Sequence, residues 1–246
     1  MRIVAVYNIK GGVGKTATAV NLAYLAARTG RRTLIWDLDP QGAASFYFRI
    51  KPKIKGGSKK LIKGKRDFDG LIKGTDFENL DLLPADFSYR HMDLLLGDAK
   101  KPTHQLQRLL RPLSEEYDYV FLDCPPSISL VSENVFAAAD ILLLPMIPTT
   151  LSIRTLSQLV DFFRQHSHKG IRVLPFFSMV DRRKNMHLDV MQNLPKKLKG
   201  MLTAYVPYAS DVERMGIHRT PVGEFAPDSL AAKAYEALWR EVSARR

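Results

Sequence analysis

The chain has 246 residues, 46% of them hydrophobic, and this length favours one α/β domain over residues 1–246 rather than two small ones. It carries 37 lysines and arginines against 25 aspartates and glutamates. The resulting net charge of +12 favours a polyanionic partner, either nucleic acid or an anionic membrane face. The single cysteine, Cys124, excludes an internal disulfide and a cysteine-bound metal cluster, so we expect a cytoplasmic protein. No apolar run reaches the roughly 18 residues of a membrane span.

Six apolar segments rich in β-branched residues predict the strands of one sheet. They cover residues 3–7, 33–36, 80–83, 119–122, 141–145 and 173–179. Because helical stretches separate them, we expect an α/β fold: a doubly wound, mostly parallel sheet with helices on both faces. The apolar spacing of residues 17–28, ending at Gly30, predicts the first helix, so residues 11–16 form a strand-to-helix turn.

Two later segments have distinctive compositions. Residues 49–66 hold nine lysines and arginines, three glycines and no acid, which predicts a solvated, mobile basic insertion rather than a packed element. We expect one face of a helix in residues 229–246 to pack on the core. That face carries Leu230, Ala234, Leu238 and Val242, with Tyr235 and Trp239 beside them.

The turn after the first predicted strand is the clearest motif, and it reads Lys10-Gly11-Gly12-Val13-Gly14-Lys15-Thr16. A strict Walker A pattern would need glycine at position 9, where this chain has Ile9. The glycines still let backbone N–H groups converge on phosphate oxygens at the start of a helix. Lys15 would reach the β- and γ-phosphates, and the Thr16 hydroxyl would bind Mg²⁺. The motif therefore predicts a fold of the P-loop NTPase type that binds ATP and Mg²⁺.

Acidic side chains at two strand ends are expected to face this loop. Asp37 and Asp39 follow the second predicted strand, and Asp123 follows the fourth. The carboxyl ends of parallel strands form the ligand crevice of such sheets, so both groups can approach the phosphates. Asp123 can hold hydrated Mg²⁺ through water, and Asp39 can orient the attacking water beside the metal, with Asp37 behind it. Taken alone, Asp37 fits a helix cap or a turn equally well.

Four segments together resemble the ParA/MinD family of deviant Walker ATPases over nearly the whole chain. Residues 10–16 resemble its Walker A loop, 37–41 its first switch, 117–127 its Walker B strand and second switch, and 179–185 its Met-x-Asp-x-Arg-x-Asn segment. The resemblance implies ATP hydrolysis to ADP and phosphate, with Lys10, Lys15 and Asp39 as the catalytic residues. It also implies an ATP-dependent sandwich homodimer in which Lys10 reaches the phosphates of the other subunit.

The same resemblance implies a nucleotide site built from the loop and two distant positions. Ala17 replaces a common Thr or Ser of the family, so any α-phosphate contact there must come from backbone N–H. Residues 148–151 also lack the glutamate and aromatic residue found in many members. The implied nucleotide contacts are Lys10, Gly11, Gly12, Val13, Gly14, Lys15, Thr16, Ala17, Asp37 and Pro207, the last near the adenine, and the implied metal ligands are Thr16, Asp39 and Asp123.

The branches of this family differ in what the ATP-bound dimer holds. ParA-like members bind DNA without sequence preference and position a plasmid, chromosome or other cargo under stimulation by a ParB-like partner. MinD-like members bind membrane through an amphipathic tail after the last helix, and this sequence ends almost where that helix does. We therefore expect double-stranded DNA rather than membrane as the partner, and a nucleoid-associated protein. The candidate DNA contacts are Arg183, which matches a DNA-contacting arginine of ParA relatives, and Arg182, Lys184, Lys196, Lys197 and Lys199.

Two other functions remain as alternatives. One is a MinD-like, membrane-associated positioning ATPase, and the other is a metabolic P-loop kinase or ligase. The second would share the phosphate loop but would give Lys10 no obvious task. An electron-transfer protein of the nitrogenase iron-protein branch would need cluster cysteines, and Cys124 is alone.

Overall fold

The computed structural model describes residues 1–63, 68, 70–165, 170–198 and 200–245. Its strands form one seven-stranded sheet in the order β3-β4-β2-β5-β1-β6-β7. Every pairing is parallel except that of β3 with β4. The strands are β1 (Arg2–Val6), β2 (Thr33–Asp37), β3 (Lys73–Gly74), β4 (Leu80–Leu83), β5 (Tyr119–Asp123), β6 (Ile141–Met146) and β7 (Arg172–Phe177). The predicted sheet is confirmed, and only the two-residue edge strand β3 had no signal in the sequence.

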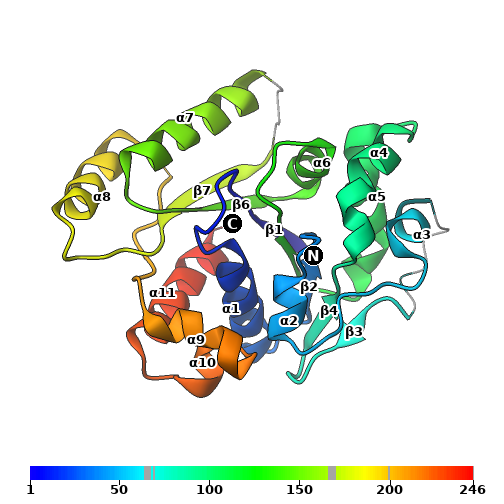
Figure 1. The fold of residues 1–246 in the computed structure, drawn as a ribbon, viewed down its shortest axis with the longest axis horizontal. Helices are drawn as coiled ribbons and strands as arrows, with labels where there is room; N and C mark the ends of the chain where they lie inside the picture. Colours follow the sequence, from blue (N-terminus) through cyan, green and yellow to red (C-terminus); the bar gives the residue numbers. More distant parts are fainter. Residues whose placement is uncertain (64–67, 69, 166–169, 199, 246) are drawn as a thin grey trace.

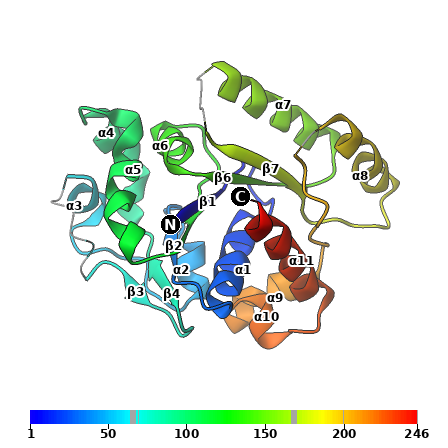
Figure 2. The same cartoon turned by 180° about the vertical axis from the view of Figure 1, so that it is seen from behind.

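Helices cover both faces of this sheet (Figures 1 and 2). One layer contains α1 (Lys15–Arg28), α2 (Ala43–Tyr47), α9 (Ser210–His218), α10 (Val222–Phe225) and α11 (Leu230–Ala244). The other contains α3 (Gly57–Lys63), α4 (Met92–Gly97), α5 (Gln105–Leu110), α6 (Leu130–Ala138), α7 (Thr150–Gln165) and α8 (Asn185–Lys197). Short 3-10 turns, η1 (Phe87–His91), η2 (Pro102–His104) and η3 (Arg111–Glu115), connect elements of the second layer. Among the described helices, none is both long and apolar enough to cross a membrane.

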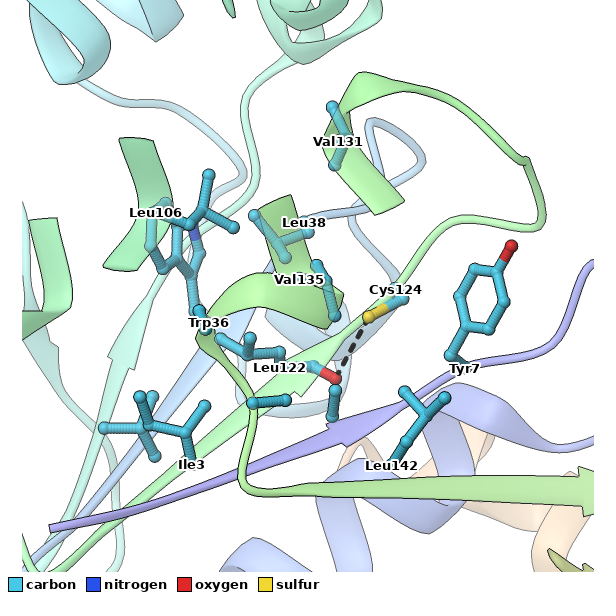
Figure 3. Packing of buried hydrophobic residues seen from close by; sticks show 14 of the residues in the cluster. Ile3, Tyr7, Trp36, Leu38, Leu106, Leu122, Cys124, Val131, Val135 and Leu142 are labelled. Atoms are coloured by element: carbon cyan, nitrogen blue, oxygen red, sulfur yellow. Dashed lines mark hydrogen bonds between the residues drawn. The ribbon is translucent and has the colours of Figure 1, made fainter. Parts of the chain in front are cut away.

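The sheet is buried on both faces because its side chains alternate between two hydrophobic clusters. In β1, Ile3 and Ala5 pack under the α4–α6 layer, whereas Val4 and Val6 pack under α1 and α11. Figure 3 shows the first cluster, with Trp36, Leu122 and Leu142 of the sheet facing Val135 of α6. Continuous apolar strands are what a parallel sheet covered on both faces requires.

The last helix packs on the core as predicted, and four of the six residues named for its inner face are buried: Tyr235, Leu238, Trp239 and Val242. Leu230 is 78% exposed. Ser229 caps the helix by accepting a hydrogen bond from Ala232 N, which places Leu230 in the first turn, on the outer side. The buried face consists of Ala231, Ala232, Tyr235, Leu238, Trp239 and Val242. The prediction is therefore wrong only for Leu230, which is exposed, and for Ala234, which is half-buried.

The basic segment 49–66 differs from the prediction of an unpacked insertion. Residues 57–63 form α3, and the side chains of Ile54, Leu61 and Ile62 are buried in the first cluster. Its lysines at 51, 53, 55, 59 and 60 are exposed. The apolar residues of this run were too few to outweigh nine charges in composition, but they all face inward. The prediction is wrong for the described part of this segment, while residues 64–66 lie outside the described residues.

Candidate nucleotide site

The phosphate loop is held in shape by the strand beside it. Asn8, which is buried at the end of β1, donates from its side-chain amide to Pro145 O of β6 at 2.8 Å. Its side-chain oxygen accepts from Lys10 N at 2.9 Å. Gly12 and Gly14 have φ of 70° and 88°, and a Cβ at Gly14 would lie 3.0 Å from Ser178 Oγ. Glycine is therefore required at position 14 by both backbone conformation and space.

Lys15 is buried at the start of α1 and points back into its own loop. Its ammonium donates to Lys10 O at 3.1 Å. Burial lowers the pKa of Lys15, while the nearby carboxylates of Asp123 and Asp39 oppose that shift. An amine held on a backbone carbonyl inside a glycine loop is ready to exchange that acceptor for a phosphate oxygen.

Asp37 and Asp123 end the adjacent strands β2 and β5 in direct register, and both are fully buried. Asp37 accepts from Ser45 N and Ser45 Oγ of α2, at 2.8 and 2.7 Å. Both carboxylate oxygens of Asp123 lack a hydrogen-bond partner. Burial and the charge of Asp37 raise the pKa of Asp123 well above its ordinary value, although the nearby Thr16 hydroxyl opposes this. Burial also raises the pKa of Asp37, to about 6.

The unpartnered carboxylate of Asp123 fits a divalent cation bound beside phosphates. A buried anion without a partner is costly, and a hard cation with oxygen ligands removes that cost. Within the described residues, no three acidic, histidine or cysteine side chains are grouped closely enough to hold an ion by themselves. Such a site suits Mg²⁺, which keeps several waters and takes one or two protein oxygens, here those of Thr16 and Asp123.

Asp39 lies in the turn between β2 and α2, where it is half-buried. Its carboxylate accepts from Gln41 N at 3.0 Å, and its carbonyl accepts from Gly42 N at 2.9 Å. Asp39 N donates to Asp37 Oδ1 at 3.3 Å. Asp39 is thus bonded to Asp37, and Asp37 pairs in register with Asp123, so the three aspartates stand at the carboxyl ends of β2 and β5 with Asp39 on the solvent side.

A cavity of about 220 Å³ opens next to the loop glycines. Pro207 lies in its wall, where Val180 and Pro207 form a short parallel bridge that extends the edge of the sheet. The size and the partly aromatic lining suit a nucleotide base. The lining residues are Gly12, Gly14, Tyr47, Ser178, Met179, Val206, Pro207, Tyr208, Ala209, Val212, Glu213 and Tyr235.

Comparison with known proteins agrees with this geometry. The sequence family described as an AAA domain (AAA_31) matches residues 1–173. The chain is 33% identical over 252 residues to the chromosome partitioning protein ParA of Myxococcus xanthus, covering 99% of this chain and 88% of that one. It is 30% identical over 249 residues to the sporulation initiation inhibitor protein Soj of Bacillus subtilis, covering 99% and 98%. The chain belongs to the ParA/Soj/MinD family of P-loop ATPases.

A solved structure of the same architecture is that of cobyrinic acid a,c-diamide synthase from Mycobacterium smegmatis with a bound ATP analogue and magnesium. It superimposes with a TM-score of 0.84 at 27% identity, covering 100% of this chain and 97% of that one. This ParA-family chain therefore shares its fold with a protein that binds an ATP analogue and Mg²⁺.

The basic residues of this ParA-family chain that were predicted to contact DNA do not form one cluster. Arg182, Arg183 and Lys184 are exposed just before α8, whereas Lys196 and Lys197 are at its far end. At 1.5 Å per residue, the two groups lie roughly 18 Å apart along the helix. Lys199 is outside the described residues. The described residues thus form two groups of exposed basic side chains at the two ends of α8, and their contact with DNA stays a prediction.

Arg183 already has an acidic partner. Its guanidinium donates two hydrogen bonds to the Asp181 carboxylate, from Nε at 2.9 Å and from an η nitrogen at 3.0 Å. These bonds lower the pKa of Asp181 to about 2. This pair was not predicted, although the acid and the arginine stand only two positions apart in the sequence.

Three polar side chains around the nucleotide site were not predicted from the sequence. Tyr47 and Tyr235 line the cavity from α2 and α11, and Ser45 holds Asp37. Tyr47 and Ser45 follow the first switch closely and could have been proposed from that position. Nothing in the sequence brings Tyr235 to residues more than 180 positions earlier, so only the packing of α11 reveals it.

Proposed function

We propose that this chain is a ParA-like ATPase that binds ATP with Mg²⁺, dimerises in that state, binds DNA without sequence preference and hydrolyses ATP slowly. The observation that carries the nucleotide part is the buried, unpartnered Asp123 carboxylate beside Thr16 and Lys15. The identity of about 30% to ParA and Soj proteins over the full length supports the partitioning part. A ParB-like partner would stimulate hydrolysis, and the protein would act in the cytoplasm on the nucleoid.

The side chains of the site have separable tasks in this proposal. Backbone N–H groups of residues 11–17 cradle the phosphates, and Lys15 leaves Lys10 O for the β- and γ-phosphate oxygens. Thr16 and Asp123 hold Mg²⁺, which when bound neutralises charge on the phosphates. Asp39 orients the attacking water from the solvent side. Asp37, fixed by Ser45, keeps the Asp39 turn in place.

The proposed dimer depends on the side chain of Lys10. This residue is half-buried at the loop, and its backbone is fixed on both sides, by Asn8 through its N–H and by Lys15 through its carbonyl. Its side chain is therefore available for phosphates other than those that Lys15 binds. Between two nucleotides in an interface of low dielectric, one such charge stabilises the dimer strongly.

The experiment that tests this proposal is fluorescence anisotropy of labelled duplexes of unrelated sequence, with ATP or ADP. The ATP form should bind every duplex about equally and at least tenfold more tightly than the ADP form, because dimerisation doubles the number of phosphate contacts. Arg183→Ala should weaken binding to all duplexes and lower the salt dependence, with nucleotide binding unchanged. Equal affinity in ATP and ADP would contradict the proposal.

A second candidate function, an ATP-dependent ligase, is favoured by the 27% identity to a protein named as a synthase. Such an enzyme would need a small-molecule acceptor for turnover. A ParA-like ATPase releases phosphate from ATP without any acceptor, and DNA and a partner protein change only the rate. Phosphate release by the purified chain with ATP and Mg²⁺ alone distinguishes the two.

A further inference from the structure

The described part of the basic segment displays five lysines on one scaffold. Residues 49–63 contain no acidic side chain. Five lysines within ten residues are all exposed, and we call them the α3 platform: Lys51, Lys53, Lys55, Lys59 and Lys60. Solubility alone does not require five positive charges so close together, and each lysine repels its neighbours.

The backbone of the platform is fixed from below. Ile54 is 3% exposed, and its N–H donates to Asp86 Oδ2 at 2.8 Å. Ile54 is thus anchored inward, while Lys53 and Lys55 on either side of it are exposed. Ser58 N donates to Ser88 Oγ at 2.7 Å, and Ser58 Oγ donates to Ser88 O at 3.1 Å. The backbone that bears these lysines is therefore already ordered, and a ligand does not have to order it on binding.

The chemistry of the platform fits the phosphate backbone of nucleic acid better than a bilayer. The apolar residues Ile54, Leu61 and Ile62 are all buried, so the platform offers charge without an apolar wedge for a membrane. A duplex carries one phosphate charge per roughly 1.7 Å of its axis, a density that suits several lysines held close together. Lysine ammonium groups bind phosphates as point charges and read no base sequence.

The platform is separate from the Arg183 surface. Helices α3 and α8 lie at opposite ends of the long axis of the molecule in both views (Figures 1 and 2). Its anchors, Asp86 and Ser88, are outside the phosphate loop and the Asp37–Asp39 turn. We propose that the α3 platform is a second DNA-binding surface, which contacts the phosphate backbone in the ADP state as well as in the ATP state.

The test uses the full chain with Arg183→Ala, in ADP, so that the proposed ATP-dependent surface does not contribute. The platform variant combines Lys51→Gln, Lys53→Gln, Lys55→Gln, Lys59→Gln and Lys60→Gln. A matched control removes five exposed charges elsewhere, by Lys100→Gln, Arg172→Gln, Lys233→Gln, Arg240→Gln and Arg245→Gln. The midpoint of thermal unfolding of both variants should match that of the Arg183→Ala chain, since all ten substituted side chains are exposed.

Binding of two unrelated labelled duplexes is then measured over roughly 50–200 mM salt. The platform variant should reduce the slope of log affinity against log salt by about 4, because five phosphate contacts are lost, and the control should change it by about 1 or less. An equal loss of salt slope in the platform variant and the control overturns the proposal. Binding to phosphatidylglycerol vesicles that depends on the platform, without binding to duplexes, also overturns it. Absence of ATP-enhanced binding in the parent chain would instead contradict the proposed function and leave this result intact.

Discussion

Asp37 and Asp123 face each other in register at the ends of β2 and β5, yet only Asp37 has hydrogen-bond donors. Burial raises the pKa of both carboxyl groups, and the charge of Asp37 raises that of Asp123 further. Ser45 stabilises one of them, so the other is left for a cation. This asymmetry supports the proposed roles, a structural one for Asp37 and a cation-binding one for Asp123.

The first prediction follows from that asymmetry. Asp123→Asn should stabilise the chain without ligand by about 1 kcal/mol or more, because an uncompensated buried charge is removed. The same variant should lose most of the Mg²⁺-dependent increase in ATP affinity. Urea denaturation and nucleotide titration with and without Mg²⁺ measure the two effects. A less stable variant that still binds Mg²⁺ and ATP normally would assign Asp123 to the core instead.

Lys15 and Asp39 should separate binding from hydrolysis. Lys15→Ala should abolish nucleotide binding, since its ammonium neutralises the phosphates from inside the loop. Asp39→Ala should keep binding and lose turnover by roughly 10²-fold or more, because the water is no longer oriented. Equilibrium binding and phosphate release give the two quantities. Normal turnover by the Asp39 variant would remove the proposed role of that residue.

Asp86 should make the folded state sensitive to acid. Burial disfavours its charge, but hydrogen bonds from Ile54 N and Ser88 outweigh burial and lower its pKa. A group with a lowered pKa stabilises the fold above its unfolded pKa and loses that effect as pH falls through the folded value. Asp86→Ala should therefore cost about 1–3 kcal/mol at pH 7, and the difference from the parent should shrink below about pH 4. A cost that is constant from pH 7 to pH 3 would contradict this.

Asp181 should restrain DNA binding through its bond to Arg183. Asp181→Asn removes the competing charge while its side-chain oxygen can still accept from Arg183 N. Affinity for duplex DNA should rise several-fold, and the salt slope should steepen by about 0.9 for one added phosphate contact. Asp189→Asn, on an exposed position of α8, is the control. No change in slope would show that Arg183 does not contact phosphate.

The strands and the phosphate loop could be predicted because their signals are local. Continuous apolar runs indicate buried parallel strands, and the loop glycines carry the phosphate chemistry within seven residues. The packing of residues 54–62 could not be predicted, because its partners Asp86 and Ser88 lie some 30 residues away. Leu230 was wrongly assigned to the buried face of α11 because it is apolar but lies in the first turn, outside the contact with the sheet. The composition of a segment does not show which distant residues it packs against. Both errors, at residues 54–62 and at Leu230, arise from such tertiary contacts.

Sedimentation velocity of the Asp39→Ala chain tests the central claim, the ATP-dependent sandwich dimer, most directly. With ATP and Mg²⁺ this variant should sediment as a dimer, and with ADP mostly as a monomer, because turnover no longer empties the ATP state. Adding Lys10→Ala should return the ATP form to a monomer while nucleotide binding persists, since a charge between the two sets of phosphates is lost. The same mass in ATP, in ADP and in the double variant would contradict the account.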